Sequence, residues 1–296
     1  MLQETVNTVL IQLRKWLQDI CVFIWKHKIV KKTCHGLVFE PKNAELKNIH
    51  LGRRAFIIGN GPSILKQDLT KLKGEITFAL NDFFLHPQYR EISPMYLCSC
   101  DPSIVNPDLR IKWYNLQRSI DTRKTTMFFK KSAQKIDREN DLFREYKVYY
   151  LNAASMLLPP MSDLTYFPID LTMPLSGHNL VMTDVALPVA IYMGIKTIYL
   201  LGFDSQPVTS FNDYLNYDFY GKHPLALMSV YKRDYQFHVL SRAFKNYRKG
   251  LHEKTIACIR RTCKKLGVRV LNATHNRGYF EGFDHIDYDK IVIAKK

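Results

Sequence analysis

The sequence predicts an α/β fold, with a doubly wound, mainly parallel sheet of the Rossmann-like kind. Short apolar runs alternate with helical stretches along the chain, and most of these runs are continuously apolar. Strands of this kind are buried on both faces, which is typical of a parallel sheet covered by helices. The 296 residues are 46% hydrophobic, which is enough to bury a core, so we expect a single nucleotide-binding domain.

Five apolar runs in the first half of the chain are predicted strands. Each is short and is bounded by turn residues or by a polar stretch. They are 53–58, 76–80, 95–100, 125–129 and 148–151. The first run ends at a glycine-rich turn, after which residues 64–72 have the spacing of a helix.

The second half of the chain contains the same alternation twice. A helix is predicted over 182–193 because Gly194 follows as its C-terminal residue, and the buried strand 197–201 comes next. A basic helix over 251–266 also ends at a glycine and leads to the last predicted strand, 268–271.

Two segments depart from this alternation. Residues 1–50 are expected to form an amphipathic helix and a linker, with apolar and aromatic residues at helical spacing and a lysine cluster after them. Such a helix suits peripheral contact of 1–32 with an anionic membrane, and packing on the domain or on a second copy of the chain is the alternative. Within the domain, 51–296, the tyrosine-rich residues 205–250 are expected to form a lid or acceptor-binding insertion.

The charge of the chain predicts an anionic partner. Lys and Arg number 43 against 27 acids, a formal net charge of +16. The basic residues cluster on one helix and one insertion and are not interleaved with aromatics along an exposed sheet, so nucleic acid is not expected. Six cysteines without paired CxxC units favour a reduced, cytoplasmic protein that lacks a structural zinc. No apolar run reaches the length of a spanning helix.

The sharpest motif follows the first predicted strand. Gly59 and Gly61 allow the backbone to turn tightly and approach a ligand, and Pro62 suits the first turn of a helix. Free N–H groups at that turn would point at an anion, with hydrogen bonds to phosphate added by Asn60 and Ser63. The motif is neither a Walker loop nor a GxGxxG fingerprint, and a plain tight turn is the alternative.

This strand and its Gly-Asn-Gly-Pro-Ser loop resemble the first nucleotide-binding loop of the bacterial sialyltransferases of glycosyltransferase family 42. They also resemble a wider family that contains flagellin-modifying glycosyltransferases and a hydroxymethylpterin diphosphokinase. Asn81 ends the second strand as in the sialyltransferases, and Asp101-Pro102-Ser103 stands where they have Asn-Pro-Ser. Residues 183–204 are similar to the helix–Gly–strand–Gly-x-Asp segment of both families, and 267–274 match the last strand of the wider one.

The resemblance implies where the donor nucleotide is held. Asn60, Gly61 and Ser63 would cradle its phosphate, and Asn81 would contact the nucleotide. Asp101 replaces an asparagine of the family, and a carboxylate there accepts hydrogen bonds but cannot donate them. The full set of expected donor-binding residues is Gly59, Asn60, Gly61, Ser63, Asn81, Asp101, Ser103, Ser176, Gly177 and Asp204.

The resemblance also implies a catalytic set. The sialyltransferases hold the leaving phosphate with tyrosines beyond the Gly-x-Asp segment, and Tyr217 and Tyr220, with Tyr214 as a further choice and Lys222 as a helper, are available here. The acceptor hydroxyl needs a base, for which histidine is suited by its pKa near 6.5. His252 is the first choice because it lies close to the family's position before the last helix. The rivals are His223 in the insertion and His178.

The expected function is an inverting glycosyl transfer from a CMP-activated donor, sialic acid or another nonulosonic acid, to a hydroxyl of a glycan or glycolipid. No metal and no cofactor besides this donor substrate is expected, because no Asp-x-Asp motif of the metal-binding kind is present. The resemblance and the charge favour a bacterial protein at the inner face of the membrane, acting on a lipooligosaccharide or capsule intermediate. The alternatives are a UDP- or GDP-sugar donor, or a magnesium-dependent pterin-type diphosphokinase on the same fold.

Overall fold

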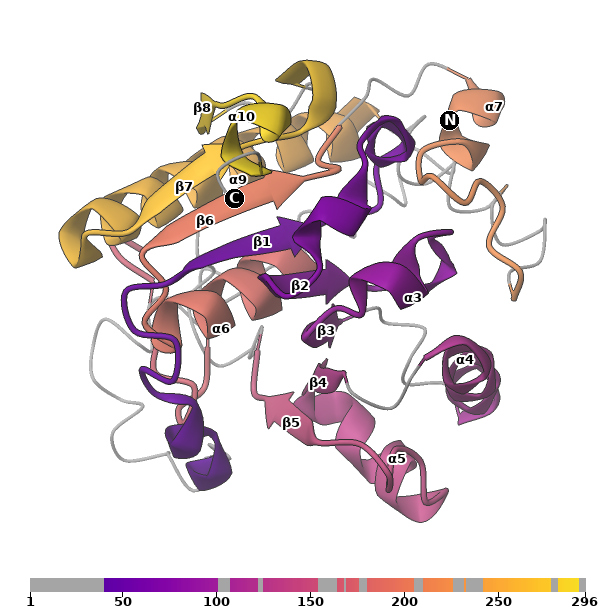
Figure 1. The fold of residues 1–296 in the computed structure, drawn as a ribbon. Coiled ribbons are helices and arrows are strands. Elements are labelled where there is room, and N and C mark those ends of the chain that lie inside the picture. Colours follow the sequence, from indigo (N-terminus) through magenta and orange to yellow (C-terminus); the bar gives the residue numbers. More distant parts are fainter. Residues whose placement is uncertain are drawn as a thin grey trace.

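The computed structural model describes residues 40–100, 107–121, 125–153, 164–167, 169–175, 180–204, 210–225, 232, 242–277 and 282–292. One sheet of eight strands runs through the molecule in the order β5-β4-β3-β2-β1-β6-β7-β8 (Figure 1). Every neighbouring pair of strands is parallel. The predicted α/β, doubly wound fold is therefore confirmed.

The predicted strands agree with the structure to within one residue at nearly every end. The strands are β1 Arg54–Ile58, β2 Ile76–Leu80, β3 Tyr96–Ser99, β4 Thr126–Lys130, β5 Val148–Leu151, β6 Thr197–Leu201, β7 Arg269–Asn272 and β8 Asp284–His285. The prediction that the chain's last strand ends near residue 271 was wrong. β8 could not be predicted from the sequence because it is two residues long and polar and therefore forms no apolar run.

Helices connect the strands, and several of them are more irregular than expected. Among the described residues, the α-helices are α3 Tyr89–Ile92, α4 Pro107–Ile120, α5 Gln134–Glu139, α6 Leu187–Tyr192, α7 Phe211–Leu215, α9 Arg242–Leu266 and α10 Tyr288–Val292. A π-helical segment, η9 Met182–Ala186, leads directly into α6. The 3₁₀ helices are η2 Pro41–Leu46, η3 Pro62–Lys66, η4 Leu69–Leu72, η5 Phe83–Leu85, η7 Lys131–Ala133 and η11 His275–Arg277.

Two helix predictions need correction. The single helix expected over 64–72 is two 3₁₀ helices, because Gln67 and Asp68 leave the helical conformation and the Asp68 side chain caps the second helix at the N–H of Thr70. The basic helix begins at Arg242 and not at Leu251. The end of the expected insertion, 242–250, is therefore part of α9.

Each face of the sheet carries its own apolar core. Along β1, Ile57 belongs to one core and its neighbours Phe56 and Ile58 belong to the other. The first core is covered by buried side chains of α6 and α9, and the second by those of α3, α4 and α10 (Figure 1). Helices thus cover both faces, which explains why the strands read as continuously apolar.

A buried ion pair joins α4 to α5. Arg110 donates from Nε and Nη2 to the two carboxylate oxygens of Asp137, both at 2.7 Å. Both side chains are shielded from water, and Phe129 and Phe143 lie against the guanidinium group. Replacing either residue would leave the other charge buried without compensation, so we expect the intact pair to be needed for stability.

Cys98, Cys100, Cys258 and Cys263 are buried and form no disulfide. Over the residues the structure describes, no helix combines the length and apolarity that crossing a bilayer requires.

Candidate functional site

The strand order reverses at β1, which has β2 on one side and β6 on the other. In open parallel sheets, ligands bind in the crevice beyond the carboxyl ends of the strands at this point. The segments that follow these three strands here are Gly59–Ser63, Asn81–Asp82 and Gly202–Asp204. The sheet therefore brings together four of the predicted donor-binding positions with Asn81 and Asp204.

The glycines of the loop after β1 allow close approach to the end of β6. The N–H of Gly59 donates to the carbonyl of Leu201 at 2.7 Å, and that of Gly61 to the carbonyl of Gly202 at 2.8 Å. A β-carbon on Gly59 or Gly61 would lie 2.7 Å or 2.6 Å from the Gly202 oxygen. These glycines make room for the end of the neighbouring strand β6.

Asp204 occupies the turn that was expected to present free N–H groups. Its Oδ2 accepts the backbone N–H of Ser63 at 3.2 Å, and the side chain is buried. A β-carbon on Gly61 would overlap this oxygen. At least one of the N–H groups that were expected to face a phosphate, that of Ser63, is therefore already bound to a carboxylate of this chain.

Four buried side-chain oxygens gather around the carboxyl ends of β1, β2 and β3. They are Asn60 Oδ1, Ser63 Oγ, Asn81 Oδ1 and Ser99 Oγ, and none has a hydrogen-bond partner among the described residues. Buried polar atoms are rarely left in that condition, because an unsatisfied group costs about 1–3 kcal/mol. We call this set the polar cluster.

The polar cluster contains three residues that the sequence had selected and one that it missed. Asn60, Ser63 and Asn81 were predicted, and Asn81 holds a left-handed backbone (φ 46°) that asparagine tolerates better than most residues. Ser99 was missed, although a serine between two cysteines at the end of an apolar strand was a visible signal.

The described part of the insertion, 210–225, is attached to the loop after β1. The N–H of Phe219 donates to the carbonyl of Asn60 at 2.7 Å. The Phe219 ring lies edge-on to Phe83 and His86, with ring centroids 6.1 Å and 5.1 Å away. A segment predicted to act as a lid therefore lies beside the polar cluster.

His86 is an uncharged member of this contact. Burial lowers its pKa to about 4, because the ring is stacked on Phe83 and removed from water. The imidazole is consequently neutral at physiological pH.

His223 accepts a hydrogen bond at Nδ1, and its Nε2 faces an acidic side chain. The N–H of Leu225 donates to Nδ1 at 3.1 Å, and Nε2 lies 3.4 Å from Oδ1 of Asp82. The same Asp82 oxygen accepts the indole N–H of Trp113 at 2.6 Å. Because the Nδ1 lone pair already accepts a hydrogen bond, His223 is better placed to hold residues 210–225 against the sheet than to act as a catalytic base. Asp82 was not selected from the sequence, although it directly follows Asn81.

The other predicted catalytic residues of this segment lie nearer the surface. The hydroxyl of Tyr220 donates to Oδ2 of Asp218 at 3.0 Å, and its ring packs edge-on against His223. Tyr217 is 41% exposed, and Lys222 is exposed as well. All three therefore stay candidates for contact with a leaving phosphate.

Several predicted positions lie outside the described residues. They are Asp101, Ser103, Ser176, Gly177, His178 and the helix expected within 1–32. His252 belongs to α9, but the description does not extend to its side chain. The roles assigned to these residues, and membrane contact through 1–32, stay predictions. In the described part of the chain no group of three or more His, Cys, Asp or Glu side chains could hold a metal ion.

The fold and the polar cluster define an α/β protein with unpartnered polar oxygens at its topological switch point. No family model matches the chain, and no curated protein is significantly similar in sequence. Among solved structures it is similar to the sialyltransferase CstII from Campylobacter jejuni in complex with cytidine-5′-monophosphate, with TM-score 0.42 and 16% identity, covering 80% of this chain and 85% of that chain. The complex of CstII from the same organism with CMP-3FNeuAc gives TM-score 0.40 and 14% identity, over 74% and 81%.

A third structure, of the same sialyltransferase with a trisaccharide acceptor and CMP, gives TM-score 0.37 and 15% identity, over 74% of this chain and 80% of that chain. These proteins are of the sialyltransferase kind that the loop motifs resemble. At such identities the likeness concerns the fold alone.

Proposed function

We propose that the chain is a glycosyltransferase whose donor is a CMP-activated sugar, sialic acid or another nonulosonic acid, and whose acceptor is a hydroxyl of a glycan or glycolipid. The observation that carries the proposal is the polar cluster. Its two amide oxygens and two hydroxyl oxygens are uncharged and buried, and they have no hydrogen-bond partner in the described part of the chain. A nucleoside monophosphate offers base, ribose and phosphate groups that would complete their hydrogen bonds.

The surroundings of the cluster favour a donor with one phosphate. The carboxylate of Asp204 stands at the turn after β1, where it would repel further negative charge. A sugar carried by CMP leaves with a single phosphate, whereas a UDP- or GDP-sugar brings two. Neutral donors from Tyr217 and Tyr220 and the charge of Lys222 could stabilise one phosphate without a metal ion.

In the proposed reaction, a histidine takes the proton from the acceptor hydroxyl. The oxygen then attacks the anomeric carbon from the face opposite CMP, and the bond from this carbon to the phosphate oxygen breaks with its electron pair on the phosphate. The configuration at the anomeric carbon is thereby inverted. His252 is the proposed base, because both nitrogens of His223 already face Leu225 and Asp82.

Thermal unfolding with nucleotides tests the donor class. CMP, CDP, UDP, GDP and ATP would each be added with and without magnesium. A ligand at one hundred times its Kd adds about 2.7 kcal/mol, which raises the midpoint by about 5–11 °C for a chain of this size. We expect a shift with CMP that does not need magnesium. A magnesium-dependent shift with ATP alone would favour the diphosphokinase, and a shift with UDP or GDP would change the donor.

Two histidine variants test the base. With a CMP-sialic acid donor and a panel of oligosaccharide acceptors, His252→Ala should abolish transfer and retain the thermal shift with CMP. His223→Ala should keep measurable transfer, because its expected defect is a looser segment 210–225. The reverse result would move the base to His223 and leave the rest of the proposal standing.

A further inference from the structure

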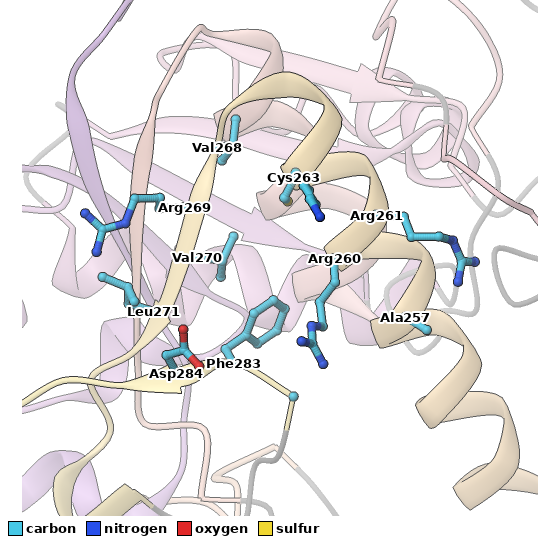
Figure 2. Close-up of a pocket in the computed structure, with 12 residues that line it drawn as sticks. Ala257, Arg260, Arg261, Cys263, Val268, Arg269, Val270, Leu271, Phe283 and Asp284 are labelled. Atoms are coloured by element: carbon cyan, nitrogen blue, oxygen red, sulfur yellow. The ribbon is translucent and has the colours of Figure 1, made fainter.

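A cavity lies away from the polar cluster, along the outer edge of the sheet. It has a volume of about 630 Å³, is open to solvent on one side and is lined by the C-terminal half of α9, by β7 and by the start of β8 (Figure 2). We call it the edge groove. Its size falls within the range of small-molecule sites, about 300–1,000 Å³.

The edge groove exists because β8 is short. β8 pairs with β7 only at Leu271 and Asn272, so the described part of the chain places no strand beside Arg269 and Val270 on that side. At one end, Gly282 lies so close to α9 that a β-carbon there would overlap the side chain of Ile256. The segment that begins at Gly282 therefore packs closely against α9 at this glycine and leaves an opening beside β7.

The floor of the edge groove is apolar. Val268, Val270 and Cys263 are largely buried and line it from β7 and α9. Figure 2 shows Phe283 between the two walls, with its ring in the space between Val270 and Arg260. A hydrocarbon chain lying along these side chains would lose contact with water, which is favourable in proportion to the apolar area removed.

Four cationic residues line the edge groove, Arg260, Arg261 and Lys264 on α9 and Arg269 on β7, and two of them, Arg260 and Lys264, lie one helical turn apart. Arg260 and Lys264 are exposed residues of α9, and neither has an ion pair or side-chain hydrogen bond with a described residue. Arg261 differs, because it donates to the carbonyls of Leu164 and Thr165, and in Figure 2 it points away from the groove. Asp284 is the acid on the groove's lining.

We propose that the edge groove binds a single molecule that carries a phosphate group on an apolar chain. Residues four apart on a helix are neighbours, so Arg260 and Lys264 can meet one anionic group together. Two cations match the charge of a phosphate monoester better than that of a carboxylate, and arginine binds phosphate oxygens in a fork. The apolar floor accounts for the chain. This site is independent of the proposed transferase site.

Isothermal titration of the full chain with farnesyl monophosphate, kept below its micelle concentration, tests the proposal. Farnesol lacks the phosphate and inorganic phosphate lacks the chain, so each should bind at least about tenfold more weakly. Vesicles of phosphatidylcholine with phosphatidylglycerol provide a separate arm, in which co-sedimentation reports attraction to a charged surface.

Three variants make the result specific. Arg260→Gln with Lys264→Gln should weaken farnesyl monophosphate binding by about tenfold or more. Val270→Ala, which removes apolar area from the floor of the groove and leaves its charge in place, should weaken it as well. Lys112→Gln with Lys254→Gln removes the same charge from exposed positions elsewhere and should change the affinity by less than about twofold. Circular dichroism melts would verify that each variant folds.

The proposal is overturned if farnesyl monophosphate does not bind, or if the two charge-matched double variants lose binding equally. Binding to vesicles alone, with equal loss in both double variants, would also overturn it, because it would assign the effect to net surface charge. If the double variant of Arg260 and Lys264 keeps the thermal shift with CMP, binding at the edge groove is independent of nucleotide binding at the proposed transferase site.

Discussion

The carboxylate of Asp204 and the α-carbon of Gly61 are in such close contact that a β-carbon at position 61 would overlap Oδ2. The same β-carbon would lie 2.6 Å from the carbonyl oxygen of Gly202. Asp204 also accepts the N–H of Ser63, a residue 141 positions away in the chain. The loop after β1 is therefore shaped by the end of β6 as much as by its own sequence.

Gly61→Ala should destabilise the protein by overpacking, by about 2–3 kcal/mol, because the added carbon would meet both a carboxylate oxygen and a backbone oxygen. Backbone strain is no part of this cost, because Gly61 has a φ of −61°, which alanine adopts readily. Urea unfolding would measure the loss. Gly74→Ala is the control, since that glycine has a positive φ but open space around it, and should lose about 1 kcal/mol. An equal or smaller loss at Gly61 would contradict the observed contact.

Ser99→Ala should separate ligand binding from stability. The Ser99 hydroxyl is buried and has no partner among the described residues, so its removal should leave the free energy of unfolding unchanged or raise it. If the hydroxyl contacts the nucleotide, the affinity for CMP should fall by about tenfold. Urea unfolding and titration with CMP measure the two quantities.

Thr77→Val is the matched control for Ser99→Ala. Its buried hydroxyl on β2 accepts the N–H of Met95 at 3.1 Å. Replacing it should cost about 1 kcal/mol of stability and leave the CMP affinity as it was. A Ser99 variant that behaves like the Thr77 variant would remove Ser99 from the ligand site.

Asp137→Ala should be among the most destabilising changes in the domain. It leaves the guanidinium of Arg110 buried without its partner and also removes the acceptor of the Tyr150 hydroxyl. The expected loss is about 3–5 kcal/mol in urea unfolding. Glu139→Ala on the same helix breaks the exposed pair with Lys135 and should cost no more than about 0.5 kcal/mol. Comparable losses in the two variants would contradict this difference.

His86 should make the fold sensitive to mild acid. Its pKa is about 4 in the folded protein against 6.5 for the exposed ring, so between these values the unfolded chain binds a proton that the folded chain does not. The stability contributed by the neutral ring is complete above pH 6.5 and is lost as the pH falls toward 4. Between pH 7 and pH 5 the loss from this residue is about 2 kcal/mol.

His86→Phe should lose less stability than the unaltered chain over the same pH interval, by that amount. Urea unfolding at pH 7 and pH 5 on both proteins gives the comparison, in which the remaining histidines cancel. Equal losses would mean that the ring is protonated as easily in the folded state as in the unfolded one.

The sheet could be predicted from the sequence because its strands are buried on both faces. The apolar runs that became β1, β2 and β6 needed no other signal. The strand order could not be predicted, since nothing local states that β1 lies between β2 and β6. The helix expected over 64–72 failed for a local reason, the capping of Thr70 by Asp68, which interrupts the apolar spacing.

Those residues of the candidate site that belong to one continuous motif could be predicted from the sequence. Contacts between the ends of two different strands could not. The loop Gly59–Ser63 and Asn81 were selected from the sequence and lie at the carboxyl edge of the sheet, and their contact with a donor stays a prediction. That the Asp204 carboxylate meets the N–H of Ser63 depends on the register between β1 and β6, which pairs Ile58 with Leu201. Ser99 needed the knowledge that β3 ends beside β2.

The pairing of β1 with β6 also governs how the chain is made. β1 can meet β2 soon after synthesis, but β6 follows about 140 residues later, a delay of about 7–30 s at ordinary translation rates. Throughout that interval an apolar strand has one edge open to any other strand nearby. We therefore expect the yield of soluble protein to depend on translation speed and on chaperones that cover β1 until its second neighbour leaves the ribosome.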